Sequence, residues 1–366
     1  MELYRIIVML LIVAHHSVVN SGLFGAISSE KISSVSTYAM LMFGAWGKTG
    51  INCFVFITGY FMCRSQITLR KFVKLYTQIF FYSVVISVIF LVAGYTHPDF
   101  RTAYGFVRSL IPVYSLTSDN FTSCFLVFWL FIPFLNILVQ HLDKRQHRLL
   151  IILSVFFWSV MSVDLRYNVA MDYVGWFSIL YFISSYVRFY PESFARVSHR
   201  QWGTLSGLSI LAGAMSVIVC TYAWLSRDAA RCEPFYFVAD SNQIFALLIG
   251  FTTFMWFKDL DIRQSRIINL LGGATFGVLL IHAHSDTMRQ WLWFDTIDMT
   301  GHYHALGAGM MLLYSAGCVA AIFMVCALVD IARSRYIEPW LNPKVERLFQ
   351  SAWHRMKRLM PAASRQ

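Results

Sequence analysis

The sequence predicts an all-α membrane protein, a transmembrane helical bundle of about ten spans with both termini in the cytoplasm. Of its 366 residues, 57% are hydrophobic and only 13% are charged, whereas globular proteins average about 45–50% apolar and about 25% charged residues. Apolar runs of roughly twenty residues, each long enough to cross a hydrocarbon core of about 30 Å, recur along the whole chain. This composition argues against a soluble fold, and the chain shows no internal repeat that would divide it.

Ten segments meet the length criterion for a membrane span. In order, they cover residues 4–22, 44–63, 72–95, 121–140, 148–163, 173–190, 203–225, 240–257, 267–284 and 305–331. The fifth and the eighth are short. The first could instead be a cleaved signal peptide, because Arg5 precedes an apolar run that ends in small residues, but His16 and Asn20 break the neutral region that cleavage requires.

Positive charge lies mostly on one side of the predicted bundle. With the N-terminus inside, 22 of the 30 lysines and arginines fall near the N-terminus, in inner loops or in the C-terminal tail, and 8 fall outside. This asymmetry follows the positive-inside rule and places both termini in the cytoplasm. Topology and contact with membrane lipids account for the net charge of +11. Nucleic-acid binding is the weaker interpretation, because no separate basic domain exists for it.

The end of the chain differs from the rest. We divide the sequence into a transmembrane domain, residues 1–332, and a cytoplasmic basic amphipathic tail, residues 333–366. In the tail, Pro343 could begin an amphipathic helix with Leu348 and Phe349 on its apolar face. Such a helix would lie on the inner leaflet as an anchor, with binding of a partner as the alternative. The predicted outer loops, at about 23–43, 96–120, 226–239 and 285–304, are longer than most inner ones.

The seven cysteines form no CxxC motif and no spaced framework. Most lie within or beside predicted spans, where cysteine serves as a small apolar residue. Only Cys124 and Cys232 fall near the predicted outer face, so one extracellular disulfide is conceivable, although the pattern gives it no support. We also expect no metal site.

Two ionisable side chains share one face of the first span. Arg5 and His16 are eleven residues apart, close to three helical turns, which corresponds to about 16 Å along the axis. Arg5 would lie at the inner surface and His16 in the outer part of the membrane, whereas His15 would point about 100° away. An ionisable side chain within a span is a functional candidate because its burial is costly. Arg5 could equally be a topological anchor, and His16 a hydrogen-bonded core residue.

A further histidine is predicted near the outer end of the ninth span. His282 lies about 22 Å along that helix from Ile267, at a depth similar to that of His16. Two intramembrane histidines at one level suggest a shared polar pocket in which His282 could orient His16. A structural pairing of the two rings without catalysis is the alternative.

The inner loop after the second span carries four positive charges, Arg64, Arg70, Lys71 and Lys74. Such a cluster could hold the phosphate groups of a cytoplasmic cofactor. The competing explanation is topology alone, because short inner loops of membrane proteins are basic for that reason.

Four segments occur in an order that is typical of one family. They are an Arg-x10-His element from Arg5 to His16, the aromatic-rich stretch NCFVFITGYF at 52–61, the stretch WLFIPFLN at 129–136, and the stretch from Phe276 to His282. Together they resemble the acyltransferase 3 family of bacterial membrane acyltransferases over nearly the whole chain. The chain departs from the family pattern where members often carry a double-arginine element, since Lys71 and Lys74 stand there beside Arg70. It also shows no hydrolase-like domain after the last span, as in the stand-alone form.

The resemblance implies a multi-pass O-acyltransferase of the bacterial cytoplasmic (inner) membrane. It would move an acyl group, most often acetyl, from cytoplasmic acyl-CoA to a hydroxyl of a cell-surface or exopolysaccharide glycan or its precursor. Acyl-CoA would be a donor substrate, with no tightly bound cofactor. His16, Arg5 and His282 would be catalytic, and the basic residues that would hold the donor are Arg64, Arg70, Lys71 and Lys74.

The residues leave the role of His16 open. A neutral imidazole could act as general base on the acceptor hydroxyl, or it could accept the acyl group first as a nucleophile. The sequence does not specify the acceptor, the acyl group or the oligomeric state.

Two other classes of protein compete with an acyltransferase. A transporter or flippase would use His16, His282 and Arg5 to line a path for a glycan-linked lipid, a small solute or protons. Broken helices or paired acidic residues in midspan would favour that class, whereas we expect the aspartates to lie in loops and the spans to be largely free of proline, with Pro133 the main exception. A membrane scaffold without activity is the third class.

Overall fold

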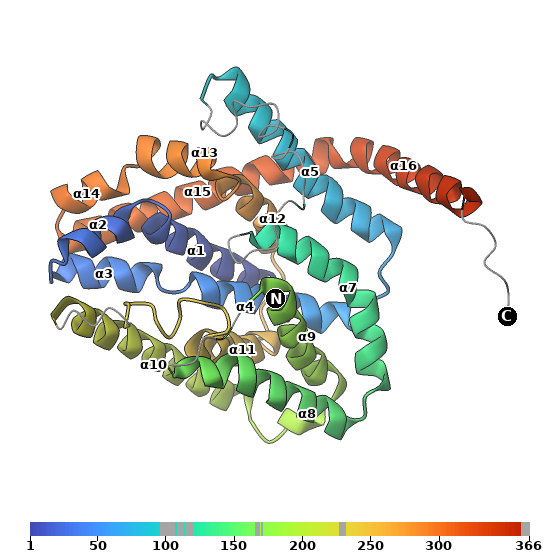
Figure 1. Cartoon of the computed structure of the whole chain (residues 1–366), viewed down its shortest axis with the longest axis horizontal. Coiled ribbons are helices and arrows are strands. Elements are labelled where there is room, and N and C mark those ends of the chain that lie inside the picture. Colours follow the sequence, from blue (N-terminus) through green and yellow to red (C-terminus); the bar gives the residue numbers. More distant parts are fainter. Residues whose placement is uncertain are drawn as a thin grey trace.

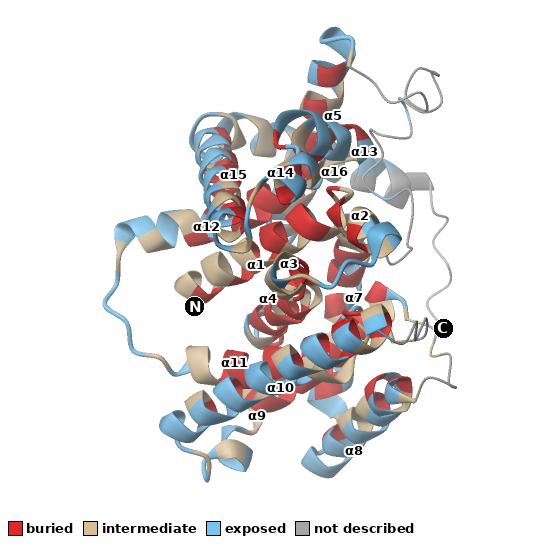
Figure 2. Cartoon of the chain, turned by 90° about the vertical axis from the view of Figure 1, so that its left-hand side faces the viewer, coloured by how far each residue is buried: buried red, intermediate tan, exposed pale blue. Residues whose placement is uncertain are grey.

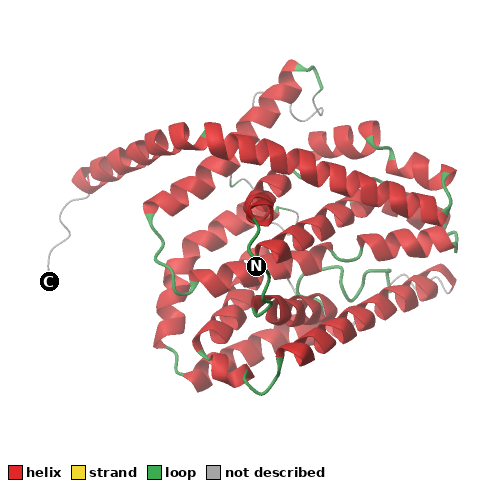
Figure 3. Cartoon of the chain, turned by 180° about the vertical axis from the view of Figure 1, so that it is seen from behind, coloured by secondary structure: helices red, strands yellow, loops and turns green. Residues whose placement is uncertain are grey.

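The computed structural model describes residues 1–95, 107, 113, 120–164, 169, 171–226 and 232–359. Within these ranges the chain forms helices joined by loops, with no β-strand (Figure 3). The predicted all-helical class is therefore confirmed.

The helices follow one another along the chain with few long interruptions. Their bounds are α1 (Glu2–Val19), α2 (Leu23–Glu30), α3 (Val35–Gly44), α4 (Gly47–Met62), α5 (Leu69–Val92), α7 (Phe121–His141), α8 (Lys144–Val155), η2 (Phe156–Val160), η3 (Met161–Val163), α9 (Tyr173–Phe189), η4 (Pro191–Phe194), α10 (His199–Ser226), α11 (Ile244–Lys258), α12 (Arg266–His282), α13 (Asp286–Arg289), η5 (Gln290–Thr296), α14 (Met299–Ala305), α15 (Ala308–Tyr336) and α16 (Glu338–Leu359). Each predicted span coincides with one or more of them.

The number of membrane crossings is smaller by length than the ten that we predicted. Seven helical stretches of the described chain are long and apolar enough to cross a membrane, or up to eight if α12 and the segment from Asp286 to Ala305, bent by 93°, form one span. The predicted spans that fall short are α9, α11 and α12, with 17, 15 and 17 residues, where a crossing takes about 20. The count of about ten, and the cytoplasmic location of both termini, therefore stay predictions.

The three short helices lie in the interior of the bundle. Helix α4 packs against α1, α9 and α11, and α1 packs against α12, so protein surrounds these helices on most sides. Peripheral helices such as α8, α10 and α15 instead turn large apolar side chains outward, among them Leu153, Leu211 and Leu313 (Figure 2). An exposed apolar surface of this extent is typical of contact with lipid.

Two segments that we predicted as outer loops are helical. Residues 23–43 contain α2 and most of α3, and residues 285–304 contain α13, η5 and most of α14. These helices gather at one end of the bundle, on the left in Figure 1, where the hydroxyls of Thr37 and Tyr303 lie 2.8 Å apart and His304 lies 3.3 Å from Glu30. These short helices are held by contacts with one another. The apolar pattern of a single segment therefore did not predict them. Of the other two predicted outer loops, 96–120 falls largely outside the described residues, whereas 226–239 is described at 226 and 232–239, where residues 232–239 form turns and bends.

The C-terminal helix begins earlier than the predicted Pro343, which lies inside α16. The apolar face of α16 packs on α5, where the Phe349 ring lies 5.9 Å from Phe72 and 5.6 Å from Tyr76, and Thr77 donates a 2.6 Å hydrogen bond to Asn342. The tail helix is thus held partly by the bundle, and its far end projects beyond it (Figure 1).

The cysteines meet in a different pair from the one that we considered. Cys232 lies beside Cys220, with their sulfur atoms 3.1 Å apart, while Cys124 is buried at the start of α7. No disulfide joins any of the seven cysteines, all of which lie in the described part of the chain.

Candidate functional site

The structure brings together the two histidines that the sequence placed at similar depth. His16 Nδ1 lies 2.9 Å from His282 Nε2, and the ring centroids are 5.1 Å apart. The contact arises because α1 and α12 pack side by side and carry these residues in their last turns. His282 is buried and His16 is partly buried.

Hydrogen bonds determine which nitrogen atoms of this pair carry a proton. His282 Nδ1 lies 2.6 Å from the carbonyl oxygen of Val278, and a carbonyl can only accept, so Nδ1 carries the hydrogen and Nε2 holds a lone pair. His16 Nδ1 must then donate to His282 Nε2. The order Val278, His282, His16 leaves a lone pair on Nε2 of His16, which is the atom that a general base or nucleophile needs.

His15 is held separately by the junction between α3 and α4. Its Nδ1 lies 2.6 Å from the carbonyl oxygen of Gly44. A Cβ atom at Gly47 would lie only 2.3 Å from the His15 ring, so a side chain at that position would displace the imidazole. His15 therefore has its own backbone partner and takes no part in the hydrogen bond between His16 and His282.

Two cations that the sequence analysis counted only as outer charges act electrostatically on His16. They are Lys48, at the start of α4, and Arg289, in α13. Lys48 donates a 2.8 Å hydrogen bond to the Tyr173 hydroxyl, and Arg289 lies 3.3 Å from Asp286. Positive charge near this pair would favour negative charge on a reacting oxygen there. Their helical positions became apparent only with the fold.

Arg5 lies in the first turns of α1, at the opposite end of the helix from His16. Its guanidinium is 3.0 Å from the Glu2 carboxylate, and both side chains are partly exposed. Glu2 in turn lies against α12, where a Cβ at Gly272 would come within 2.5 Å of its carboxylate oxygen. Arg5 is therefore part of a local ion pair at the end of the helix, and the structure does not bring it into contact with the histidines.

The four basic residues after α4 are all exposed, but they differ in their partners. Lys74 lies 3.0 Å from Glu338 at the start of α16. Lys71 donates to Ser65 Oγ and to the Gln66 carbonyl, at 2.5 and 2.9 Å. Arg64 donates a 3.3 Å hydrogen bond to a backbone carbonyl of α9, and Arg70 occupies the first turn of α5. The four basic residues are thus exposed in one segment of the chain, and Lys74 alone pairs with the tail helix.

A buried acid in α15 contradicts our expectation that the aspartates lie in loops. Asp330 is 3% exposed, and its Oδ1 accepts hydrogen bonds from Gln78 at 3.1 Å, from Tyr82 at 2.8 Å and from Arg333 at 2.8 Å. A Cβ at Gly277 of α12 would lie 2.2 Å from the Asp330 side chain, so glycine provides the space for the carboxylate. Two of the donors come from α5 and the third from the next turn of α15, so the carboxylate joins these two helices.

The aromatic-rich stretch at 52–61 also has a packing role. A Cβ at Gly59 would lie 2.1 Å from Ser184 Oγ, so the glycine allows α4 to approach α9. Arg188 donates a 2.8 Å hydrogen bond to the Tyr60 hydroxyl. Asn52 is buried and accepts a 2.9 Å hydrogen bond from the Trp176 indole. These contacts set α4 against α9, and α4 also carries Lys48 towards His16.

A comparison with family models supplies independent evidence. The model of the acyltransferase 3 family, described as an acyltransferase domain, matches residues 1–330. This range includes the His16 and His282 helices and the aromatic-rich stretch of α4. Comparisons with curated proteins and with solved structures gave no match. On the match over most of its length, the chain belongs to the acyltransferase 3 family and is a membrane acyltransferase.

Proposed function

We propose that the protein transfers an acyl group, most often acetyl, from cytoplasmic acyl-CoA to a hydroxyl of a cell-surface or exopolysaccharide glycan or its precursor, in a bacterial inner membrane. Membership of the family supports acyl transfer in general. The observation that supports this chemistry is the hydrogen-bonded pair of His16 and His282, whose arrangement leaves one imidazole lone pair. Acyl transfer to a hydroxyl needs a base or a nucleophile, and both require such a lone pair.

In the base mechanism, Nε2 of His16 takes the proton of the acceptor hydroxyl. At the same time, the hydroxyl oxygen bonds to the thioester carbon. The carbon–sulfur bond then breaks, and the proton passes from His16 to the departing thiolate of coenzyme A. While His16 is protonated, its hydrogen bond to His282 becomes charge-assisted and roughly twice as strong as a neutral one. The positive charges of Lys48 and Arg289 would favour the oxyanion. In the alternative, Nε2 attacks the thioester carbon, the carbon–sulfur bond breaks and the thiolate of coenzyme A departs. The acceptor hydroxyl then takes the acyl group from Nε2, its proton passes to the thiolate, and the neutral imidazole is restored.

The donor would enter from the side that carries the basic residues. Arg64, Arg70 and Lys71 are exposed there and could bind nucleotide phosphates, since charge-assisted hydrogen bonds are the strong ones in phosphate recognition. The flexible thioester arm would extend along α1, over the axial rise of about 16 Å between Arg5 and His16. Arg5 would then border the path of the donor.

The proposal is tested by supplying labelled acetyl-CoA to membranes with and without the protein. Label recovered in purified cell-surface glycan, only when the protein is present, is the expected result. A glycan that changes sides without acquiring label would identify a flippase. If the glycan neither acquired label nor changed sides, the protein would be a scaffold without activity. The flippase result and the scaffold result would each contradict the proposed reaction.

His282→Ala should lower kcat by about 10²-fold or more, because His16 loses the acceptor that fixes its tautomer. The KM for the donor should change little, since His282 does not bind the donor phosphates in this account. His282→Gln offers an amide oxygen to the same Nδ1–H and should recover part of the rate. Steady-state kinetics on the two variants checks this. A kcat for His282→Ala equal to that of the wild type would remove His282 from the mechanism.

Lys71→Ala and Lys74→Ala should raise the KM for acyl-CoA by up to about tenfold and leave kcat nearly unchanged, because they remove exposed charges from the donor phosphates. The effect should be larger for Lys71, since Lys74 already pairs with Glu338. Arg145→Ala, at an exposed basic residue of α8, is the matched control. Donor KM values that match the control would exclude both lysines from the donor site.

A further inference from the structure

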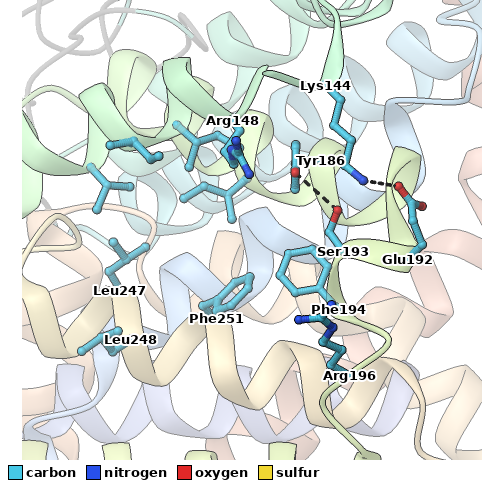
Figure 4. Close-up of a pocket in the computed structure, with 14 residues that line it drawn as sticks. Lys144, Arg148, Tyr186, Glu192, Ser193, Phe194, Arg196, Leu247, Leu248 and Phe251 are labelled. Carbon is cyan, nitrogen blue, oxygen red and sulfur yellow. Dashed lines mark hydrogen bonds and ion pairs between the residues drawn. The ribbon is translucent and has the colours of Figure 1, made fainter. Parts of the chain in front are cut away.

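A cavity of about 710 Å³ lies between α8, α9, η4 and α11, on a flank of the bundle (Figure 4). This volume falls within the range of about 300–1,000 Å³ that is typical of ligand sites. Beyond the cavity, the end of the α8 segment is joined to the chain before α11, since Asn242 donates a 2.8 Å hydrogen bond to the Trp158 carbonyl and Ser162 donates one of 3.3 Å to Gln243. Helices α8 and α11 are thus in contact through these bonds at one end. The cavity lies between them towards the start of α8.

The lining of the cavity is divided into an apolar part and a charged part. The apolar side chains come from α8, α9 and α11 and include Ile151, Ile152, Val155, Ile183, Leu247, Leu248 and Phe251. In Figure 4, Leu247 and Leu248 lie on one side of the view and Lys144 and Glu192 on the other, while Arg148 lies above the apolar side chains and Arg196 lies below Phe194. The charge pattern of the sequence assigns the charged end to the cytoplasmic side.

The charged part of the lining has an excess of positive charge. Lys144 lies 2.5 Å from Glu192 and lowers the pKa of that carboxyl through their hydrogen bond, which keeps it ionised. Arg148 and Arg196 are exposed and form no ion pair with any residue that the structure describes. Two guanidinium groups that line the cavity are therefore available to bind an anion.

The cavity opens towards lipid and is separate from the histidine pair. Two of its lining residues, Ile152 on α8 and Leu248 on α11, are 55% and 41% exposed, which places the opening on the outward face of the bundle. Neither α1 nor α12 contributes to its lining, and α4 packs against α1 on one side and α11 on another. An acyl group held here would not meet His16, so the cavity does not serve the proposed acyl-CoA path.

We propose that this cavity binds one phospholipid with an acidic headgroup from the inner leaflet. Its phosphate would accept charge-assisted hydrogen bonds from Arg148 and Arg196, and one acyl chain would lie between α8 and α11. The charge complementarity and the opening to lipid favour this occupant over a free phosphate, which would leave the apolar walls uncovered. Basic pockets between membrane helices on the cytoplasmic side bind lipid headgroups on the same principle. The bound lipid would fill the space between α8 and α11.

The test is titration of the purified full-length protein in neutral detergent, followed by native mass spectrometry. The probes are phosphatidylglycerol, phosphatidylcholine, glycerol 3-phosphate and palmitoyl-CoA. Wild type should bind one phosphatidylglycerol in preference to phosphatidylcholine, and the double variant Arg148→Gln, Arg196→Gln should bind it about tenfold more weakly or worse. Arg145→Gln is the matched control, because Arg145 is exposed on α8 but does not line the cavity.

Three results would overturn the proposal. The double variant and the control could bind phosphatidylglycerol equally, glycerol 3-phosphate could bind as tightly as the lipid, or palmitoyl-CoA could be preferred with the same dependence on Arg148 and Arg196. The last result would make the cavity a donor site. Thermal unfolding of each variant without lipid checks that the protein is folded. Because no acyl transfer is measured, failure of the proposed reaction and failure of this site are distinguishable.

Discussion

His16→Ala is expected to lower acyl transfer by about 10³-fold or more while the protein stays inserted and folded. The imidazole supplies the lone pair that either removes the acceptor proton or accepts the acyl group, and general-base groups alone contribute about 10²–10⁴-fold. Alanine offers neither function, and a water molecule in its place is a far weaker base. The measurement is the initial rate of labelled acetyl transfer to glycan, normalised to the amount of folded protein.

The control for this variant is His141→Ala. His141 is an exposed histidine in the last turn of α7, with only a local hydrogen bond to the Ile137 carbonyl, so its loss should leave the rate within about twofold of wild type. Thermal unfolding in detergent reports whether both variants are folded. A well-folded His16→Ala protein with the wild-type rate would show that the catalytic mechanism is wrong.

Asp330→Ala is expected to destabilise the protein by about 3–5 kcal/mol, the usual cost of removing one partner of a buried ion pair. The variant leaves the Arg333 guanidinium, which is 6% exposed, without its nearest acid. It also removes the acceptor of hydrogen bonds from Gln78 and Tyr82, which are both buried. The remaining partner of Arg333, Glu338, lies 3.3 Å away and compensates only in part.

Equilibrium unfolding in mixed micelles measures this cost, and two variants test its origin. Asp330→Ala combined with Arg333→Met removes both charges and should be more stable than Asp330→Ala alone, because no unpaired charge stays buried. Lys74→Ala, at the exposed end of the same network, should cost about 1 kcal/mol or less. If Asp330→Ala cost no more than Lys74→Ala, the buried network would not stabilise the helices.

Hydropathy predicted the position of the helices better than their role. Helices such as α5, α7 and α15 face lipid over much of their length, so apolar run length identifies them directly. The interior helices α9, α11 and α12 are also apolar, but with 17, 15 and 17 residues they are shorter than the length of about 20 that a crossing usually takes. A sequence window cannot tell lipid from protein as the neighbour of an apolar side chain, so apolar run length alone does not separate a membrane crossing from a helix packed inside the bundle.

The site was predictable where it depends on position along a helix, and not where it depends on lateral contact. Helical rise alone placed His16 and His282 at one depth. Helical rise does not show that α1 and α12 are neighbours, because His16 and His282 are 266 residues apart in the sequence. Nor does it show that the Val278 carbonyl determines which nitrogen of His282 carries the proton. Arg289 was missed because residues 285–304 were interpreted as a loop, and Lys48 was missed because, at the outer end of the predicted span 44–63, it was counted only as an outer charge.

The structure also contains one feature that we had associated with a transporter, the sharp bend after α12. Asp330 is a buried acid near the end of α15, whereas the feature that we associated with a transporter was paired acidic residues in midspan. Asp330 Oδ1 accepts hydrogen bonds from Gln78, Tyr82 and Arg333. These bonds hold helices together. A buried acid in an apolar run was visible in the sequence, and the nearby Arg333 was the signal for its partner.

The pairing of His16 with His282 has a consequence for synthesis of the protein. His282 leaves the ribosome 266 residues after His16, roughly 13–53 s later at translation rates of about 5–20 residues per second. During that interval α1 must reside in the bilayer without its partner helix. An uncharged imidazole is far cheaper to hold there than a permanent ion, whose insertion costs about 2.5–3.5 kcal/mol at the centre of a span. A relay of two neutral rings and a backbone carbonyl can therefore be assembled one helix at a time.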